Sequence, residues 1–230
     1  MEDSLIDFRM PRLVFIVEGD AEQHFINMHL VGYLSQKFPG VGMHAQKITT
    51  NRHLNKKGGN VSYALFRNEL KRTAAQGNVL ITTMLDFFRL PNDFPGYSTD
   101  VLTIDVMEDR IRTDCATIII PQYFRPYIQK HEFEALLFAN LNGFSTVLDD
   151  SEMKQVKKIV NDCGSPEDID GGVETAPSKR LQSIFNYKKV ADSILVMSDV
   201  NIDRLRRSCP RFDEWVGSLE YALANGRFGT

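Results

Sequence analysis

The stretch from Phe15 to Glu22 constrains the fold of this chain most. An apolar run over residues 13–17 ends at Glu18, turns at Gly19 and is followed by a second carboxylate, Glu22. Short β-branched runs closed by Gly and Asp are typical of a buried strand and its turn. Residues 21–36 then place apolar side chains at helical spacing. We therefore expect Glu18 at the carboxyl end of a strand and Glu22 in the first helical turn, at the edge of an α/β sheet where ligands bind.

Two carboxylates held this close need a physical reason. At about 4 Å they repel each other by roughly 4 kcal/mol at an effective dielectric constant near 20. A hard cation such as Mg²⁺ removes this repulsion, because it takes oxygen ligands from one or two carboxylates and keeps several waters. A second interpretation stays open, in which Glu22 complements the positive end of its helix and Glu18 points to solvent. More acids at neighbouring strand ends would favour the cation.

Composition limits the class of protein. With 230 residues, one domain, or one domain with a helical extension, is expected. No apolar run approaches the roughly 20 residues that cross a bilayer. The start Met1-Glu2-Asp3-Ser4 lacks the basic start and apolar core of a signal peptide. We expect a cytoplasmic protein without a membrane partner.

The formal net charge of −3 gives no global attraction to nucleic acid, so binding to nucleic acid requires a local basic patch or a metal.

The cysteines do not form a recognisable site. Cys115, Cys163 and Cys209 are far apart and odd in number, and they form no C-x-x-C pair. Neither a disulfide framework nor a zinc site is therefore expected.

Further acids follow later segments of the chain. Residues 79–86 form a second buried strand pattern that again ends on an acid, Asp86. A rigid, proline-bearing loop over 87–95 contains Asp93. Residues 131–138 carry Glu132 and Glu134, which point to different faces of a regular helix but can turn to the sheet edge at a strand-to-helix junction. The alternative, in which Phe133 and its apolar neighbours are core and the glutamates only decorate the helix start, stays open.

Weaker patterns complete the expected element order. Residues 42–49 alternate weakly, and 116–120 and 125–128 have strand character, whereas 61–75 and 99–112 have helical character. After residue 140 the pattern is helical over 151–163, 199–208 and 210–225, and Pro177 with Ser178 opens another helix. We therefore expect an α/β domain over residues 1–140 and a helical extension over 141–230, packed on the same core.

Three basic segments are candidates for contact with phosphate or a partner. The loop 51–60 is rich in Gly, Asn and Lys, and its glycines permit close backbone approach to a phosphate. A loop of this composition is more often a solvated connection, and that interpretation is the one favoured here. Lys179 or Arg180 can stabilise developing negative charge, or can be surface charge at a helix start. The arginines between residues 204 and 211 form the strongest basic run.

Several stretches together resemble a known family. The strand ending in Val17-Glu18-Gly19, with Glu22 following, and the strand ending in Leu85-Asp86 resemble the Toprim domain of topoisomerases, bacterial primases and overcoming-lysogenization-defect (OLD) nucleases. More closely, the chain resembles a Toprim-like bacterial family of unknown function, domain of unknown function 4276, found beside AAA-type ATPases. The stretches that carry this likeness are 17–22, 59–62, 82–87, 90–96, 126–138, 176–180 and 209–212.

The resemblance implies a Toprim-like, Rossmann-like α/β fold: a mostly parallel sheet flanked by helices and carrying an acidic cluster that binds Mg²⁺ or Mn²⁺. Glu18 matches the Toprim glutamate, and Asp86 matches the first aspartate of its D-x-D pair. The sequence departs from the family pattern at Phe88, where the second aspartate is expected. Asp93, Glu132 or Glu134 are the candidates to replace it.

The function implied is metal-dependent cleavage of phosphodiester bonds in nucleic acid, as the effector of an ATPase-coupled bacterial defence system. Glu18, Glu22 and Asp86 would bind the metal, Glu18 is also a candidate general base, and Lys179 would stabilise negative charge. An alternative of another class is a catalytically inactive regulatory subunit of an AAA ATPase complex. A haloacid-dehalogenase-type phosphatase is set aside, because Phe88 replaces the second acid that it needs. DNA or RNA as substrate stays open, and a homodimer is compatible with the resemblance.

Overall fold

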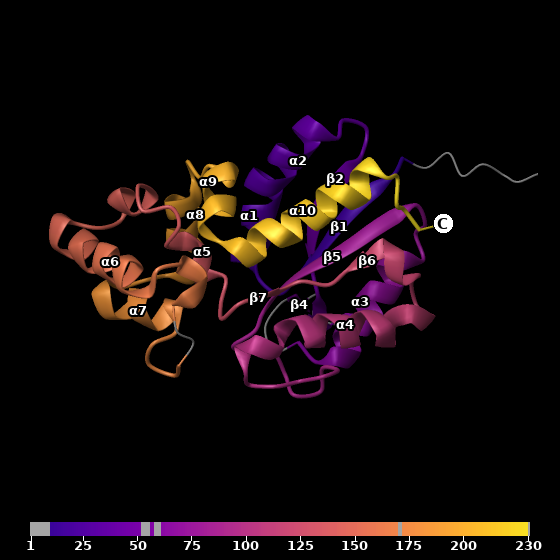
Figure 1. Cartoon of the computed structure of the whole chain (residues 1–230), viewed down its shortest axis with the longest axis horizontal. Helices are drawn as coiled ribbons and strands as arrows, with labels where there is room; N and C mark the ends of the chain where they lie inside the picture. The colour runs from indigo at the N-terminus through magenta and orange to yellow at the C-terminus, as the bar shows by residue number, and fades with distance from the viewer. Residues whose placement is uncertain (1–9, 52–55, 58–60, 170–171, 230) are drawn as a thin grey trace, which may run out of the picture.

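The computed structural model of the chain describes residues 10–51, 56–57, 61–169 and 172–229. A parallel sheet forms one end of the molecule and a group of short helices forms the other (Figure 1). The strand order in the sheet is β2-β1-β5-β6, and β7 also pairs with β5. The strands are β1 (Arg12–Val17), β2 (Gly42–Lys47), β5 (Val79–Asp86), β6 (Phe124–Arg125) and β7 (Ile128–Gln129), and all these pairings are parallel.

The two central strands are buried on both faces. Leu13, Phe15 and Val17 of β1 pack into one hydrophobic cluster, whereas Val14 and Ile16 pack into another. This alternation follows from the two-residue period of a strand. Parallel strands that are covered on both faces have nearly continuous apolar sequences. The strands over residues 13–17 and 79–86 were therefore recognisable from the sequence. The predicted α/β fold with a parallel sheet flanked by helices is confirmed.

Helices cover both faces of the sheet. The helices on one side are α1 (Asp20–Phe25), α2 (Val31–Lys37) and α10 (Pro210–Ala224), and those on the other are α3 (Tyr63–Ala74) and α4 (Ile104–Asp114) (Figure 1). A π-helical turn over Ile26–Leu30 joins α1 to α2, so the helix predicted over residues 21–36 forms with one widened turn. Ser62 caps α3 by accepting a hydrogen bond from the backbone N–H of Leu65.

The C-terminal part of the chain is helical, as predicted. It contains α5 (Glu134–Leu137), α6 (Asp150–Cys163), α7 (Pro177–Ile184), α8 (Lys189–Met197) and α9 (Ile202–Ser208). Asp149 and Glu152 form a capping box at the start of α6, and Pro177 occupies the first turn of α7. The sequence analysis did not predict α8. Residues of these helices share one hydrophobic cluster with β1. The division of the chain at residue 140 stays a prediction.

Two expectations for the sheet edge were wrong or incomplete. Residues 116–120 do not form a strand; 3₁₀ turns over Cys115–Thr117 and Pro121–Tyr123 occupy this region. The predicted strand 125–128 is split into β6 and β7 by Pro126, which has no N–H to donate to a ladder. In the predicted phosphate loop 51–60, Asn51 ends β3 (Thr49–Asn51), which pairs with β4 (Lys56–Lys57). The other residues of that loop lie outside the described part of the chain.

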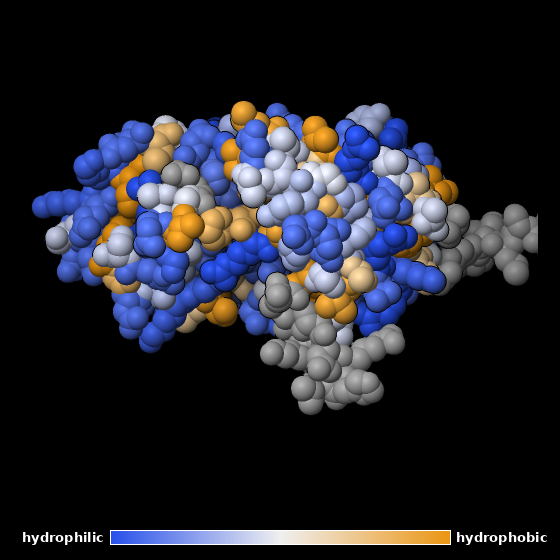
Figure 2. Space-filling view, turned by 90° about the horizontal axis from the view of Figure 1, so that it is seen from below, coloured by the Kyte–Doolittle hydropathy of each residue, from blue (hydrophilic) through white to orange (hydrophobic). Residues whose placement is uncertain are grey.

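The surface gives little indication of a large apolar interface on the face that Figure 2 shows. That face is mostly hydrophilic, with hydrophobic residues in small separate groups (Figure 2).

Within the described residues, no helix is both long enough and apolar enough to cross a membrane. Cys115, Cys163 and Cys209 are free thiols.

Candidate active site

Four acids and one lysine meet at the carboxyl edge of the sheet. Glu18 follows β1, Glu22 lies in the first turn of α1, and Asp86 ends β5. Glu134 begins α5 and Lys189 begins α8. We call these five residues the acidic cluster. Because the carboxyl ends of β1 and β5 are neighbours in the sheet, the strand-end acids are brought together by the topology alone.

The ammonium group of Lys189 lies between three buried carboxylates. Its Nζ is 3.0 Å from Oε1 of Glu22, 3.3 Å from Oδ2 of Asp86 and 3.3 Å from Oε2 of Glu134. The side chains of these acids are only 2%, 8% and 1% exposed. Burying three carboxylates together is costly unless a cation accompanies them. Lys189 supplies that cation in this structure.

Some carboxylate oxygens of the acidic cluster accept hydrogen bonds, and others accept none within the described residues. Oδ1 of Asp86 accepts a hydrogen bond from the backbone N–H of Phe133 at 2.8 Å, and the hydroxyl of Tyr187 donates to Oε1 of Glu134 at 3.4 Å. By contrast, Oε2 of Glu22 and Oε2 of Glu134 are buried and accept no hydrogen bond within the described part of the chain, although Oε2 of Glu134 is ion-paired with Lys189. Buried oxygen atoms without hydrogen-bond donors indicate a site that can accept a further ligand.

Gly19 determines where the Glu22 carboxylate lies. A Cβ atom at position 19 would be only 2.5 Å from Oε2 of Glu22, which is far closer than atoms pack. The backbone at Gly19 is extended, with φ of −129°, so the requirement is steric and not conformational. Glycine at this turn therefore allows the carboxylate to lie directly against the chain that joins β1 to α1.

Burial and mutual repulsion hold protons on the three glutamates of the cluster near neutral pH. Burial, followed by the charges of Asp86 and Glu22, raises the pKa of Glu18 to about 8. Burial likewise raises the pKa of Glu134 to about 7 and raises the pKa of Glu22, with Lys189 opposing the shift in both. Burial alone would lower the pKa of Lys189, but the three carboxylates raise it above its ordinary value. The lysine is therefore charged, and Glu22 and Glu134 beside it resist ionisation.

Three of the residues suggested by the sequence do not join this cluster. Asp93 is exposed in its loop, and its Oδ2 accepts a hydrogen bond from the backbone N–H of Tyr63 at 2.9 Å, at the start of α3. Lys179 donates to Oε1 of Gln182, 3.2 Å away on its own helix. Glu132 is buried, but its Oε2 accepts from the backbone N–H of Ser178 at 2.9 Å and so holds the start of α7. Asp93 and Glu132 are thus held by backbone N–H donors, and Lys179 by an acceptor on its own helix, away from the cluster.

The donor set suits a hard divalent cation. All of its available ligand atoms are carboxylate oxygens, which Mg²⁺ and Mn²⁺ prefer, and two of them have no hydrogen-bond donor. Among the described residues, however, no group of three or more His, Cys, Asp or Glu side chains is already arranged around a metal-sized centre. The ammonium group of Lys189 lies between the carboxylates instead.

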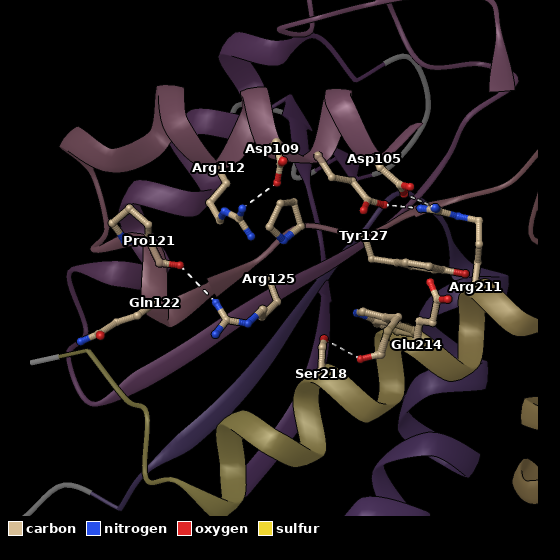
Figure 3. A pocket seen from close by; sticks show the side chains of 13 residues that line it. Asp105, Asp109, Arg112, Pro121, Gln122, Arg125, Tyr127, Arg211, Glu214 and Ser218 are labelled. Carbon is tan, nitrogen blue, oxygen red and sulfur yellow. Dashed lines mark hydrogen bonds and ion pairs between the residues drawn. The ribbon is translucent and has the colours of Figure 1, made fainter. Parts of the chain in front are cut away.

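A cavity of about 530 Å³ lies away from the acidic cluster, between α4 and α10 beside β6 (Figure 3). Two of its arginines are paired with carboxylates: Arg211 pairs with Asp105 and lies 2.8 Å from Oε1 of Glu108, and Arg112 lies 2.6 Å from Oδ1 of Asp109. Nε of Arg211 is buried and has no hydrogen-bond partner within the described residues. The Arg125 guanidinium donates to the carbonyl of Pro121 at 3.2 Å. This pairing explains how α4 is held to α10, and it leaves few groups for a ligand.

Comparison with solved structures identifies similar folds. The C-terminal region of the Burkholderia pseudomallei OLD protein is 15% identical and matches with a TM-score of 0.50, covering 93% of this chain and 100% of that one. The C-terminal region of the Xanthomonas campestris pv. campestris OLD protein is 17% identical with a TM-score of 0.48, covering 94% and 95%. The Burkholderia structure supports the Toprim-like α/β fold; at this identity the likeness concerns the fold alone.

No curated protein matches the chain. The family model described as "Domain of unknown function (DUF4276)" matches residues 17–220, which include every member of the acidic cluster. This confirms the family resemblance inferred from the sequence, and the chain belongs to the DUF4276 family.

Proposed function

We propose that this protein is a nuclease that cleaves phosphodiester bonds in nucleic acid with the help of Mg²⁺ or Mn²⁺. The observation that carries the proposal is the convergence of Glu22, Asp86 and Glu134, all buried, on one cationic centre at the carboxyl edge of a parallel sheet. Two of their oxygens accept no hydrogen bond within the described residues. The fold shared with the C-terminal region of an OLD protein agrees with this proposal.

The chain's own residues would have distinct roles. Glu22, Asp86 and Glu134 would hold the metal ion, which when bound polarises a phosphate and lowers the pKa of a water molecule. Glu18 is half-buried at the end of β1, and its pKa near 8 means that its carboxylate is mostly ionised, and so able to take up a proton from an attacking water, only above about pH 8. Lys189 would stabilise negative charge on the phosphate, the role that the sequence analysis gave to Lys179.

The proposed partners follow from the family resemblance. We propose that the protein acts on DNA or RNA as the effector of an AAA-type ATPase in a bacterial defence system. A homodimer fits this proposal. Arg89, whose exposed side chain lies close enough to Glu18 to oppose the rise in its pKa, would contact a phosphate beside the acids.

A second candidate function is a catalytically inactive regulatory subunit of the same ATPase complex. Two observations favour it: Phe88 stands where the Toprim pattern has its second aspartate, and the Lys189 ammonium already neutralises the carboxylates. In this case the lysine would be a permanent structural substitute for a metal ion.

The experiment that separates the two is cleavage of supercoiled plasmid and of total transfer RNA by the purified protein with Mg²⁺, Mn²⁺ or EDTA. Asp86→Asn and Glu22→Gln are the test variants, and Lys179→Ala is the control. Metal-dependent cleavage that is lost in both acid variants and kept in the control supports the nuclease. Absence of cleavage under every metal, also after addition of the partner ATPase, supports the inactive subunit.

A further inference from the structure

A second cavity, of about 460 Å³, opens at the same edge of the sheet as the acidic cluster. Its walls come from the loops that follow β5 and β7 and from the segment before α7. Phe87, Phe88 and Tyr97 give it three aromatic rings, and Ser98, Asp100 and His131 give it polar groups. We call it the aromatic pocket. Cavities of this size, mostly apolar with a few polar groups, are typical of small-ligand sites.

The aromatic pocket is tied directly to the acidic cluster. Phe87 follows Asp86 in the chain, and the backbone N–H of Phe88 donates to the carbonyl of His131 at 2.9 Å. On the other side of Phe88 is Arg89, whose charge acts on Glu18. The four consecutive residues 86–89 therefore supply a carboxylate of the cluster, two aromatic rings of the pocket and a cation beside the cluster.

The backbone at His131 is strained. Its φ is +64°, in the left-handed region that non-glycine residues rarely adopt, and the side chain is buried. Strain of this kind persists only where the surroundings fix it, often at ligand sites. His131 lies between β7 and α5, so this turn both lines the pocket and leads to Glu134 of the cluster.

We propose, resting on the nuclease function above, that the aromatic pocket binds an unstacked nucleobase, so that the substrate is a single-stranded or locally unpaired nucleic acid. A base whose neighbouring phosphate lies at the acidic cluster and Arg89 would stack on Phe88 and Tyr97. Stacking suits this pocket because every base has a π-face, and the polar groups at the rim can hydrogen-bond the base edge. Bases paired within a duplex cannot enter it without extrusion.

The test is fluorescence anisotropy with labelled single-stranded DNA and RNA oligonucleotides and with the matching duplexes. It is run on the full chain in EDTA and in Ca²⁺. The variants are Phe88→Ala and Tyr97→Ala, with Tyr97→Phe to keep the ring. Tyr221→Ala is the matched control, because Tyr221 is an aromatic residue of similar exposure on α10, 57% against 40% for Tyr97, outside the pocket.

The expected result is that both alanine variants bind single strands about five- to tenfold more weakly, while Tyr97→Phe and Tyr221→Ala bind like the unmodified protein. Duplexes should bind more weakly than single strands from the start. Equal binding by all variants, or a loss in Tyr221→Ala as large as in Tyr97→Ala, overturns the pocket assignment even if cleavage is observed. If the unmodified protein neither binds nor cleaves any nucleic acid, the proposed function itself fails as well.

Discussion

The ammonium group of Lys189, at the first residue of α8, lies 3.0 Å from the carboxylate of Glu22, in the first turn of α1. The same group reaches Asp86 and Glu134, so a single lysine of α8 links Glu22 and Asp86 of the sheet-bearing part with Glu134 of α5. This contact makes the acidic cluster dependent on how the sheet and the C-terminal helices pack. It also places a cation between the carboxylates that we propose as metal ligands.

Replacing Lys189 by Ala should destabilise the metal-free protein by about 2 kcal/mol. Leaving buried charges without their partner costs roughly 3–5 kcal/mol, and we reduce this figure because the Lys189 side chain is 42% exposed. Mg²⁺ or Mn²⁺ should then raise the midpoint of thermal unfolding more in this variant than in the unmodified protein. The measurement is thermal unfolding in EDTA and in each metal, with Lys188→Ala, the exposed neighbour, as control. An identical metal response in the two variants would contradict the prediction.

Gly19→Ala should abolish metal-dependent activity with little effect on folding. The added Cβ would meet Oε2 of Glu22 at 2.5 Å and force the carboxylate out of the cluster, whereas the extended backbone at Gly19 accepts alanine. The matched control is Gly32→Ala in α2, where an added Cβ meets no atom within 4 Å. We expect the control to be as active as the unmodified protein and at least as stable, because alanine favours helix over glycine by about 1 kcal/mol. Cleavage assays and circular dichroism check both variants, and full activity of Gly19→Ala would refute the role of Glu22.

The stability of the metal-free protein should fall as the pH rises from about 5 to 8. Glu18 has a pKa near 8 in the folded protein and an ordinary value of 4.5 when unfolded, so between these values the folded state binds more protons. Unfolding then releases protons, and the free energy of unfolding decreases with pH. Glu134, with a pKa near 7, adds to the effect. Urea unfolding in EDTA at several pH values should show a shallower fall for Glu18→Gln than for Glu214→Gln, whose side chain is exposed. Parallel curves for the two variants would argue against a protonated Glu18.

Substitution of Glu132 and of Glu134 should have different effects on stability and metal binding, although the two residues are only two positions apart. Glu132→Ala leaves the backbone N–H of Ser178 unpaired in a buried setting and should lower the free energy of unfolding by about 1–3 kcal/mol. Binding of Mn²⁺ should be unchanged, because the Glu132 carboxylate is directed at α7. Glu134→Ala should instead weaken Mn²⁺ binding. Urea unfolding and metal titration together separate the two effects, and a loss of Mn²⁺ binding in Glu132→Ala would place Glu132 among the ligands after all.

The sequence alone determined the elements whose signals are local. The apolar runs ending at Glu18 and Asp86 predicted β1 and β5, and helical spacing after Gly19 predicted α1 and α2. Because parallel strands present their carboxyl ends at one edge, the meeting of Glu18, Glu22 and Asp86 could be expected before the structure was known. The family resemblance reached the same three residues.

Only the tertiary structure decided which other side chains complete the site. Helix α8 was not predicted because Lys188, at its N-cap, supplies no side-chain acceptor for the first helical N–H groups. Lys189 therefore had no recognisable context, and Lys179 was chosen in its place. Likewise Glu132 and Glu134 are equivalent in the sequence, and their separation depends on the donor that α7 places near one of them. A contact between distant helices is fixed by how their faces pack on a shared core, and no local pattern of residues encodes that packing.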